Sequence, residues 1–129
     1  MAKIDRFEDL QCWQRARELE NIIYGISTVD SFSKDYALKD QINRASGSVM
    51  DNIAEGFGRG GNKEFIHFLI ISRASAIEVQ SQLYRALDRK HIDAAQFKEV
   101  LEKTNQVVSI ISGFINYLRN SERKGPRFE

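Results

Sequence analysis

Apolar residues recur along most of this chain at alternating steps of three and four, which is the spacing of an amphipathic α-helix. The pattern falls into four long segments separated by short breaks. The first segment runs from Phe7 to Ile26. We predict a second helix capped by Ser33, a third capped by Asn62 and a fourth opened by Asp93, because short polar side chains accept the unpaired N–H groups of a first turn.

Each predicted helix carries an apolar seam, and no stretch alternates with the period of two that a half-buried strand shows. Short connections between long helices make sequential neighbours antiparallel. The sequence therefore predicts an all-α fold, an antiparallel up-down-up-down four-helix bundle. We expect residues 1–121 to form this single domain and residues 122–129 to be a flexible basic tail. The predicted inward seams are Cys12, Ala16, Leu19, Ile23 and Ile26; Leu38, Ile42, Ala45, Val49 and Ile53; Phe65, Leu69, Ser72, Ala76, Val79, Leu83 and Ala86; and Phe97, Leu101, Thr104, Val108, Ile111, Ile115 and Leu118.

The glycine cluster at 56–61 is expected to end the second helix, because glycine readily takes the left-handed conformation that follows a helix. Gly56, Gly58 and Gly61 also satisfy the G-x-G-x-x-G spacing of dinucleotide sites. That fingerprint works only where a strand leads into a helix. Here it follows a predicted helix, so we expect no cofactor.

The third helix carries more apolar surface than one stripe of a bundle buries. Its surplus side chains predict self-association. The second helix adds a polar stripe at steps of three and four, in which Asn52 stands where the heptad favours an apolar residue; this stripe is either a solvated face or an interface. The residues expected between subunits are Asn52, Ile66, Phe68, Ile70 and Ile71.

Composition adds few constraints. Hydrophobic residues make up 42% and charged residues 29%, as in ordinary globular domains, and the formal net charge is +1. Cys12 is the only cysteine, so no internal disulfide forms. The N-terminal segment is too charged for a signal peptide, and no run approaches the ~18 apolar residues of a membrane span. We expect a cytoplasmic protein without a membrane partner.

Two spacings suggest chemistry and are weak. Glu64 and His67 form the Glu-x-x-His pair of di-iron bundles, yet such sites require the motif on two helices. Arg85 and His91 have the spacing of the Arg/His motif in HEPN-type ribonucleases, where histidine would transfer a proton and arginine would stabilise phosphate charge. We predict no metal, no catalytic residue and no small-molecule substrate, with the ribonuclease as the lesser alternative.

A family resemblance narrows the function further. The stretch at 41–59 reads QINRASGSVMDNIAEGFGR, and Phe7-Glu-Asp-Leu10 with Trp13 precedes it. These residues, together with Glu64, Phe65 and Leu69, resemble the four-helix-bundle proteins encoded by intervening sequences within bacterial 23S rRNA genes. Residue 43 is Asn where the family pattern has a second basic residue, and Arg73 precedes Ala-Ser rather than Gly-Ser.

The resemblance implies a homopentamer of four-helix protomers. It also implies kinship in fold to the accessory protein of diversity-generating retroelements, which associates with nucleic acid and a reverse transcriptase. We therefore expect a non-enzymatic homo-oligomer that binds RNA or an RNA-processing protein. The alternative is a structural or adaptor oligomer that binds no nucleic acid. The expected phosphate contacts are Arg15, Arg17, Arg44, Arg59 and Lys63.

Overall fold

A computed structural model of the chain describes residues 4–121. Over these residues every regular element is a helix, which confirms the all-α prediction. The predicted tail, residues 122–129, lies outside the described residues. No helix among the described residues has the length and apolar character needed to cross a membrane. The elements are a 3-10 helix η1 (Phe7–Asp9) and the α-helices α1 (Gln11–Ser27), α2 (Asp30–Lys34), α3 (Tyr36–Gly58), α4 (Asn62–Asp88) and α5 (Ala94–Ser121).

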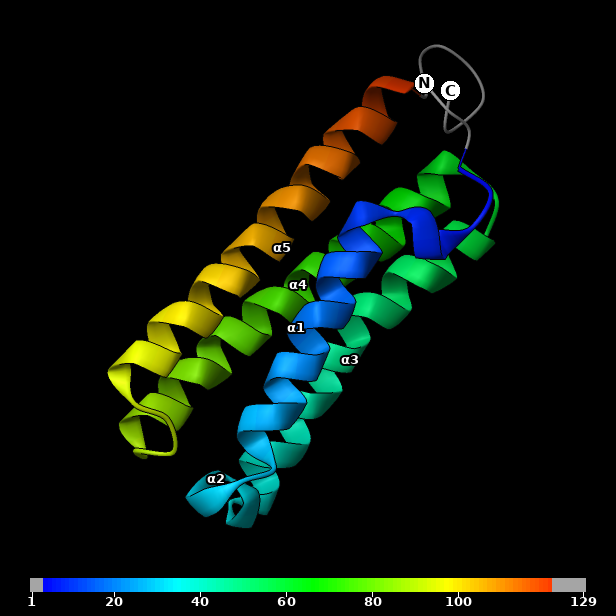
Figure 1. The fold of residues 1–129 in the computed structure, drawn as a ribbon. Helices are drawn as coiled ribbons and strands as arrows, with labels where there is room; N and C mark the ends of the chain where they lie inside the picture. The colour runs from blue at the N-terminus through cyan, green and yellow to red at the C-terminus, as the bar shows by residue number, and fades with distance from the viewer. Residues whose placement is uncertain (1–3, 122–129) are drawn as a thin grey trace.

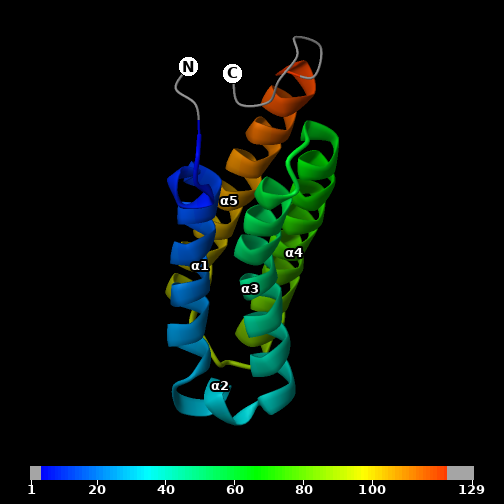
Figure 2. The ribbon, with the colours of Figure 1, turned by 90° about the vertical axis from the view of Figure 1, so that its right-hand side faces the viewer.

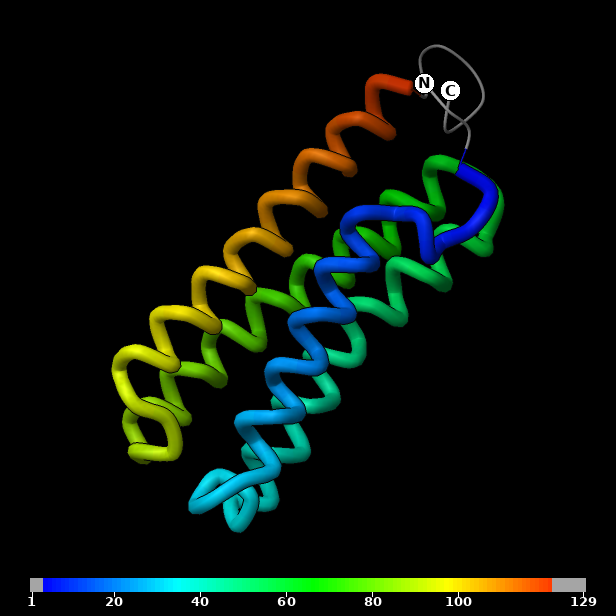
Figure 3. The backbone as a smooth tube through the Cα atoms, in the orientation of Figure 1, coloured from blue at the N-terminus to red at the C-terminus, as the bar shows by residue number. Residues whose placement is uncertain are grey.

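The four long helices α1, α3, α4 and α5 lie side by side, and each runs opposite to the one before it (Figure 1, Figure 3). Helix α1 packs on α3 and α5, and helix α4 also packs on α3 and α5. The short α2 crosses the end of the bundle between α1 and α3 (Figure 2). The predicted count of four helices therefore omitted α2, and the predicted first helix is divided into η1 and α1.

The core follows the predicted seams closely. All predicted inward residues of α3 and of α4 are buried. Ile26 of α1 is only partly buried. On α5, Val100 and Val107 are buried while Leu101 and Val108 are partly exposed, so the core-facing side of its first half is turned from the predicted one.

The start of α3 was predicted at the wrong residue. Ser33 lies inside α2, where its hydroxyl donates to the Asp30 carbonyl at 2.6 Å. The N-cap of α3 is Asp35, whose carboxylate accepts from the Leu38 N–H at 3.3 Å. A separate short helix thus occupies residues 30–34, most of which the periodicity assigned to the break before the second helix.

The predicted cap of α4 is wrong, whereas the predicted cap of α5 is confirmed. Asn62 is the first residue of α4, and its side-chain amide donates to the Leu118 carbonyl at 3.2 Å instead of capping the helix. Asp93 opens α5 as predicted, and it forms a reciprocal capping box with Gln96. The Gln96 N–H donates to the Asp93 carboxylate at 2.8 Å, and the Asp93 N–H donates to the Gln96 side chain at 3.0 Å.

Two glycines of the cluster at 56–61 have different structural roles. Helix α3 continues through Gly56, and the residue with a left-handed φ of 97° is Gly60. At Gly56 a Cβ would lie 2.6 Å from the Cβ of Phe68 and 2.9 Å from Cδ1 of Phe65. Gly56 therefore allows α3 and α4 to approach closely, whereas Gly60 forms the turn.

Candidate assembly and nucleic-acid interfaces

Helix α4 presents an apolar stripe to solvent. Ile70, Ile77 and Tyr84 are seven residues apart and are 37%, 49% and 53% exposed. Ala74 and Ser81 lie between them, so the steps along the stripe are 4, 3, 4 and 3, as in the contact seam of packed helices. We name Ile70, Ala74, Ile77, Ser81 and Tyr84 the α4 outer seam. Of the residues that the sequence analysis expects between subunits, Ile70 belongs to this seam.

The predicted interface residues are not all part of this surface. Ile66 is 8% exposed and belongs to the core of its own chain, so it adds little to the exposed apolar area. Phe68 is half-buried, with the Arg59 guanidinium 5.0 Å from its ring centroid. Ile70 and Ile71 are each 37% exposed and remain available to another subunit.

The polar stripe of α3 lies along its contact with α4. The Ser48 hydroxyl hydrogen-bonds to the Ser75 hydroxyl at 3.0 Å. The Asn52 side-chain amide donates to the carbonyl and the hydroxyl of Ser48, each at 2.8 Å. Ser72, three residues before Ser75 on α4, is buried in the core, and its hydroxyl donates to the Val49 carbonyl at 2.6 Å. The stripe is therefore largely satisfied within one chain, and Asn52 has a structural partner without a second subunit.

Four of the five predicted phosphate contacts are exposed and Arg15 is partly buried, and most of them already contact a partner in the same chain. Arg15 pairs with Glu18 at 3.5 Å, and Arg44 pairs with Asp40 at 3.1 Å. Arg17 lies over the Trp13 ring, with its guanidinium carbon 5.7 Å from the ring centroid.

Arg59 pairs with Glu55 at 2.9 Å, and the hydrogen bond to this carboxylate raises the pKa of Arg59 above its ordinary value. Lys63 is exposed in the first turn of α4, and no ion pair to it occurs within residues 4–121. Surface pairs of this kind contribute about 0–1 kcal/mol, so these cations can exchange a carboxylate for a phosphate.

The five cations do not form one patch. Arg59 and Lys63 flank the turn between α3 and α4, whereas Arg44 stands fifteen residues earlier on α3, roughly 22 Å along the helix axis. Arg15 and Arg17 are two positions apart on α1 and therefore project from different faces. A single subunit thus offers scattered positive charge.

One cluster of chemically capable side chains escaped prediction from the sequence. The His91 Nδ1 lies 2.9 Å from the Ser31 hydroxyl, and its Nε2 lies 2.9 Å from Oδ2 of Asp35. Arg89 donates to the same carboxylate oxygen at 2.7 Å. Hydrogen bonds from His91 and then Arg89 lower the pKa of Asp35 to about 2. The His91 ring also stacks on Phe32 at 5.1 Å.

This cluster joins α2, the first turn of α3 and the turn between α4 and α5, and we name Ser31, Asp35, Arg89 and His91 the corner clasp. The order serine, histidine, aspartate is that of a hydrolase triad. Asp35, however, also caps α3 and pairs with Arg89, which are structural tasks.

The weaker chemical predictions have no support in the geometry. Arg85 donates to the Gln41 side chain at 2.9 Å, while both ring nitrogens of His91 are engaged within the corner clasp. Arg85 and His91, the two residues of the ribonuclease alternative, therefore bind different partners. No group of three His, Cys, Asp or Glu side chains within residues 4–121 is placed to hold a metal ion.

Comparison with known proteins places the chain in a family. The model of the 23S rRNA-intervening sequence protein family matches residues 8–113. The chain belongs to this family. The match confirms the resemblance carried by residues 41–59, which lie on α3 and its C-cap. In this intervening sequence protein, the family stretch supplies the close approach at Gly56 and the polar ladder from Ser48 to Asn52.

A solved structure shares the fold. It is the crystal structure of a protein of unknown function from the S23 ribosomal protein family of Bacteroides thetaiotaomicron VPI-5482, with a TM-score of 0.74 and 19% sequence identity, covering 81% of this chain and 95% of that chain. At this identity the likeness shows the fold alone. None of the curated proteins compared with this intervening sequence protein matches it.

Proposed function

We propose that this intervening sequence protein is a non-enzymatic homopentamer whose subunits meet along the α4 outer seam and whose assembled surface binds RNA. The observation that supports assembly is the exposure of Ile70, Ile77 and Tyr84 on one heptad-spaced stripe. Fully burying a side chain of this size contributes about 1.5–3 kcal/mol. A second helix laid along this stripe would cover all three. The subunit number five comes from the family resemblance.

Assembly is tested by reversing the polarity of the seam. Ile77→Glu, alone and with Ile70→Glu, is expected to reduce the solution mass from five times the 14.8 kDa of one chain to the mass of a single chain. Assembly would remove the new carboxylate from water, and burying an unpaired charge is costly in free energy. Static light scattering at micromolar concentration measures the mass. Val29→Glu is the matched control, since Val29 is 51% exposed and lies before α2, far from the seam in the sequence. A wild-type chain that is monomeric at this concentration would contradict the proposal.

RNA binding rests on repetition of the scattered cations. In a ring of subunits each arginine recurs, so a modest charge on one chain becomes a stronger local field. Alanine at both Arg59 and Lys63 is expected to weaken RNA binding and to flatten its salt dependence, because each lost phosphate contact reduces the log–log slope by about 0.7–0.9. Fluorescence anisotropy between about 50 and 200 mM salt measures this slope. Lys98→Ala, on α5, is the control and should leave the slope unchanged.

The ion pairs of Arg15, Arg44 and Arg59 favour a second candidate, an adaptor oligomer that binds a protein. Cations already paired with carboxylates attract polyanions less than free ones. An oligomeric wild type that binds no RNA, even at low salt, would select this candidate. Assembly and RNA binding are therefore separable in these measurements.

A further inference from the structure

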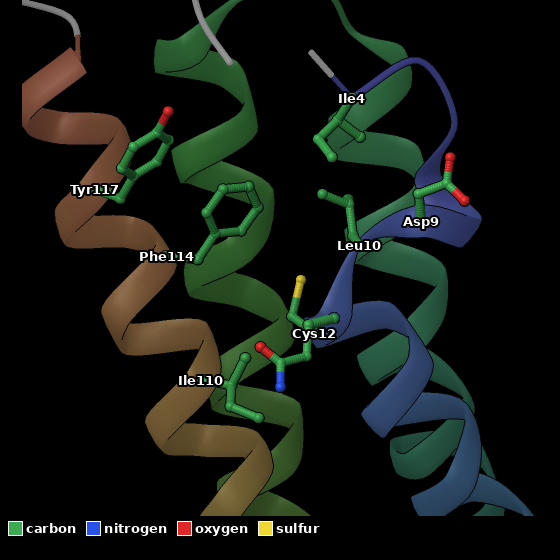
Figure 4. A pocket seen from close by; sticks show the side chains of 8 residues that line it. Ile4, Asp9, Leu10, Cys12, Ile110, Phe114 and Tyr117 are labelled. Carbon is green, nitrogen blue, oxygen red and sulfur yellow. The ribbon is translucent and has the colours of Figure 1, made fainter. Parts of the chain in front are cut away.

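A cavity of about 300 Å³ opens between the beginning of α1 and the C-terminal half of α5. Figure 4 shows Ile110, Phe114 and Tyr117 of α5 on one side, facing Ile4, Leu10 and Cys12 on the other. The three α5 residues follow one another at steps of four and three, so they line the cavity over roughly 10 Å of the helix axis. The lining residues are Ile4, Asp9, Leu10, Gln11, Cys12, Ile110, Phe114 and Tyr117.

Part of the wall of this cavity belongs to the core. Leu10 is 5% exposed and Cys12 is 2% exposed, whereas Ile4, Ile110, Phe114 and Tyr117 are partly buried residues that pack against the core. Phe114 packs edge-on against the fully buried Phe65, with ring centroids 5.4 Å apart, which holds that wall in place. An apolar space with firm walls gains free energy when an apolar molecule replaces water in it.

The volume limits what can enter. A helix with its side chains is about 10–12 Å across and does not fit within such a space. An apolar cavity of about 150 Å³ is enough to hold benzene. Twice that volume therefore suits a small molecule of about two fused rings or an alkyl chain of similar bulk.

The charges select a neutral molecule. Among the described residues that line the cavity, Asp9 is the only charged one, and Figure 4 shows its carboxylate turned away from Phe114 and Ile110. None of the described lining residues is a lysine or an arginine that could pair with a carboxylate or phosphate group. Burial raises the pKa of the Cys12 thiol to about 12, so this group remains neutral and does not act as a nucleophile.

We propose that this cavity is a binding site for a neutral apolar small molecule of about two-ring size. Besides Tyr117, the only neutral polar side chain among the described lining residues is that of Gln11, which suits a ligand carrying at most one uncharged polar group. The ligand is held and not converted. This site is independent of the α4 outer seam, which lies on another helix.

A matched pair of fluorescent two-ring probes tests the charge preference at the size that the cavity volume favours. 2-Naphthol is neutral, and naphthalene-2-sulfonate carries the same two-ring system with a sulfonate. The full-length protein is expected to bind the neutral probe saturably, with one site per chain, and the anionic probe at least tenfold more weakly. Ile110→Trp fills the cavity and is expected to weaken the neutral probe at least tenfold. Val108→Trp, on the same helix but outside the lining, is expected to retain binding.

Three results would overturn the proposal. The neutral probe could fail to bind wild-type protein, or it could bind Ile110→Trp and Val108→Trp equally. Alternatively, Ile110→Trp could reduce the oligomeric mass to that of a single chain, which would show that the residues lining the cavity form a contact between subunits. Circular dichroism and thermal unfolding of both tryptophan variants establish that each is folded. Since Ile77→Glu leaves the cavity untouched, failure of assembly and failure of ligand binding are read separately.

Discussion

Replacing Asp35 by alanine is expected to lower the free energy of unfolding by roughly 2–4 kcal/mol, because this carboxylate holds three elements of the corner clasp together. It caps α3 through the Leu38 N–H, accepts from His91 at 2.9 Å and accepts from Arg89 at 2.7 Å. Loss of the cap costs ~1 kcal/mol, and loss of a charge-assisted hydrogen bond costs ~1.5–3 kcal/mol. The Arg89 pair adds little, since its side chain is 45% exposed.

The neighbouring Asp40 is the control for this prediction. It pairs with Arg44 on the same helix, and both side chains are largely exposed, at 60% and 79%. Asp40→Ala is expected to change stability by less than ~0.5 kcal/mol. Urea unfolding followed by circular dichroism gives both free energies. Equal effects from the two substitutions would show that the corner clasp contributes no more than an ordinary surface ion pair.

The pH dependence of the stabilisation by Asp35 has a defined sign. The pKa of Asp35 falls from 3.8 to about 2 in the folded protein, first through its hydrogen bond with His91 and then through that with Arg89. Between these values the unfolded chain binds more protons, so the stabilisation by Asp35 is complete above about pH 5 and is lost as the pH falls towards 2. The stability difference between wild type and Asp35→Asn should therefore narrow from pH 5 to pH 2.

The sequence predicted the interior better than the helix boundaries. Heptad spacing placed Leu38, Ile42 and Val49 on the buried side of α3, because the angle around a helix follows from residue number alone. The start of α3 depends instead on Asp35, and Asp35 depends on His91, which is 56 residues away in the sequence. A local pattern favours Ser33 and Asp35 alike as caps. The tertiary contact decides between them.

The candidate interface shows the same limit. Periodicity indicated that α4 has too much apolar surface, and the exposure of Ile70 and Ile77 agrees with this. It could not show which residues neighbouring helices of the same chain cover, so Ile66 was included although it is buried. The sequence could not predict the hydrogen bonds of Asn52 within α3 either. The heptad pattern does not show whether the partner of a polar residue lies in the same chain or in another subunit. The cavity beside Cys12 depends on the packing of α1 against α5, which spacing does not encode.

Gly56→Ala is expected to destabilise the protein by about 2 kcal/mol, although alanine is the better helix former by ~1 kcal/mol. The new Cβ would lie 2.6 Å from the Cβ of Phe68 and 2.9 Å from the ring of Phe65, which is fully buried. A Cβ is fixed to the backbone and cannot rotate away. Helices α3 and α4 must therefore move apart along their contact, which loosens the packing around Phe65.

Gly113 provides the opposite case on α5. A Cβ at Gly113 meets nothing within 4 Å, so Gly113→Ala gains helix propensity without a clash and is expected to stabilise by about 0.5–1 kcal/mol. The two substitutions add the same methyl group to the same residue type in a helix. Thermal unfolding should therefore show melting temperatures that move in opposite directions, with Gly56→Ala lower by roughly 6–10 °C. If Gly56→Ala also raised the melting temperature, the glycine would be a consequence of the turn that follows and not of the α3–α4 contact.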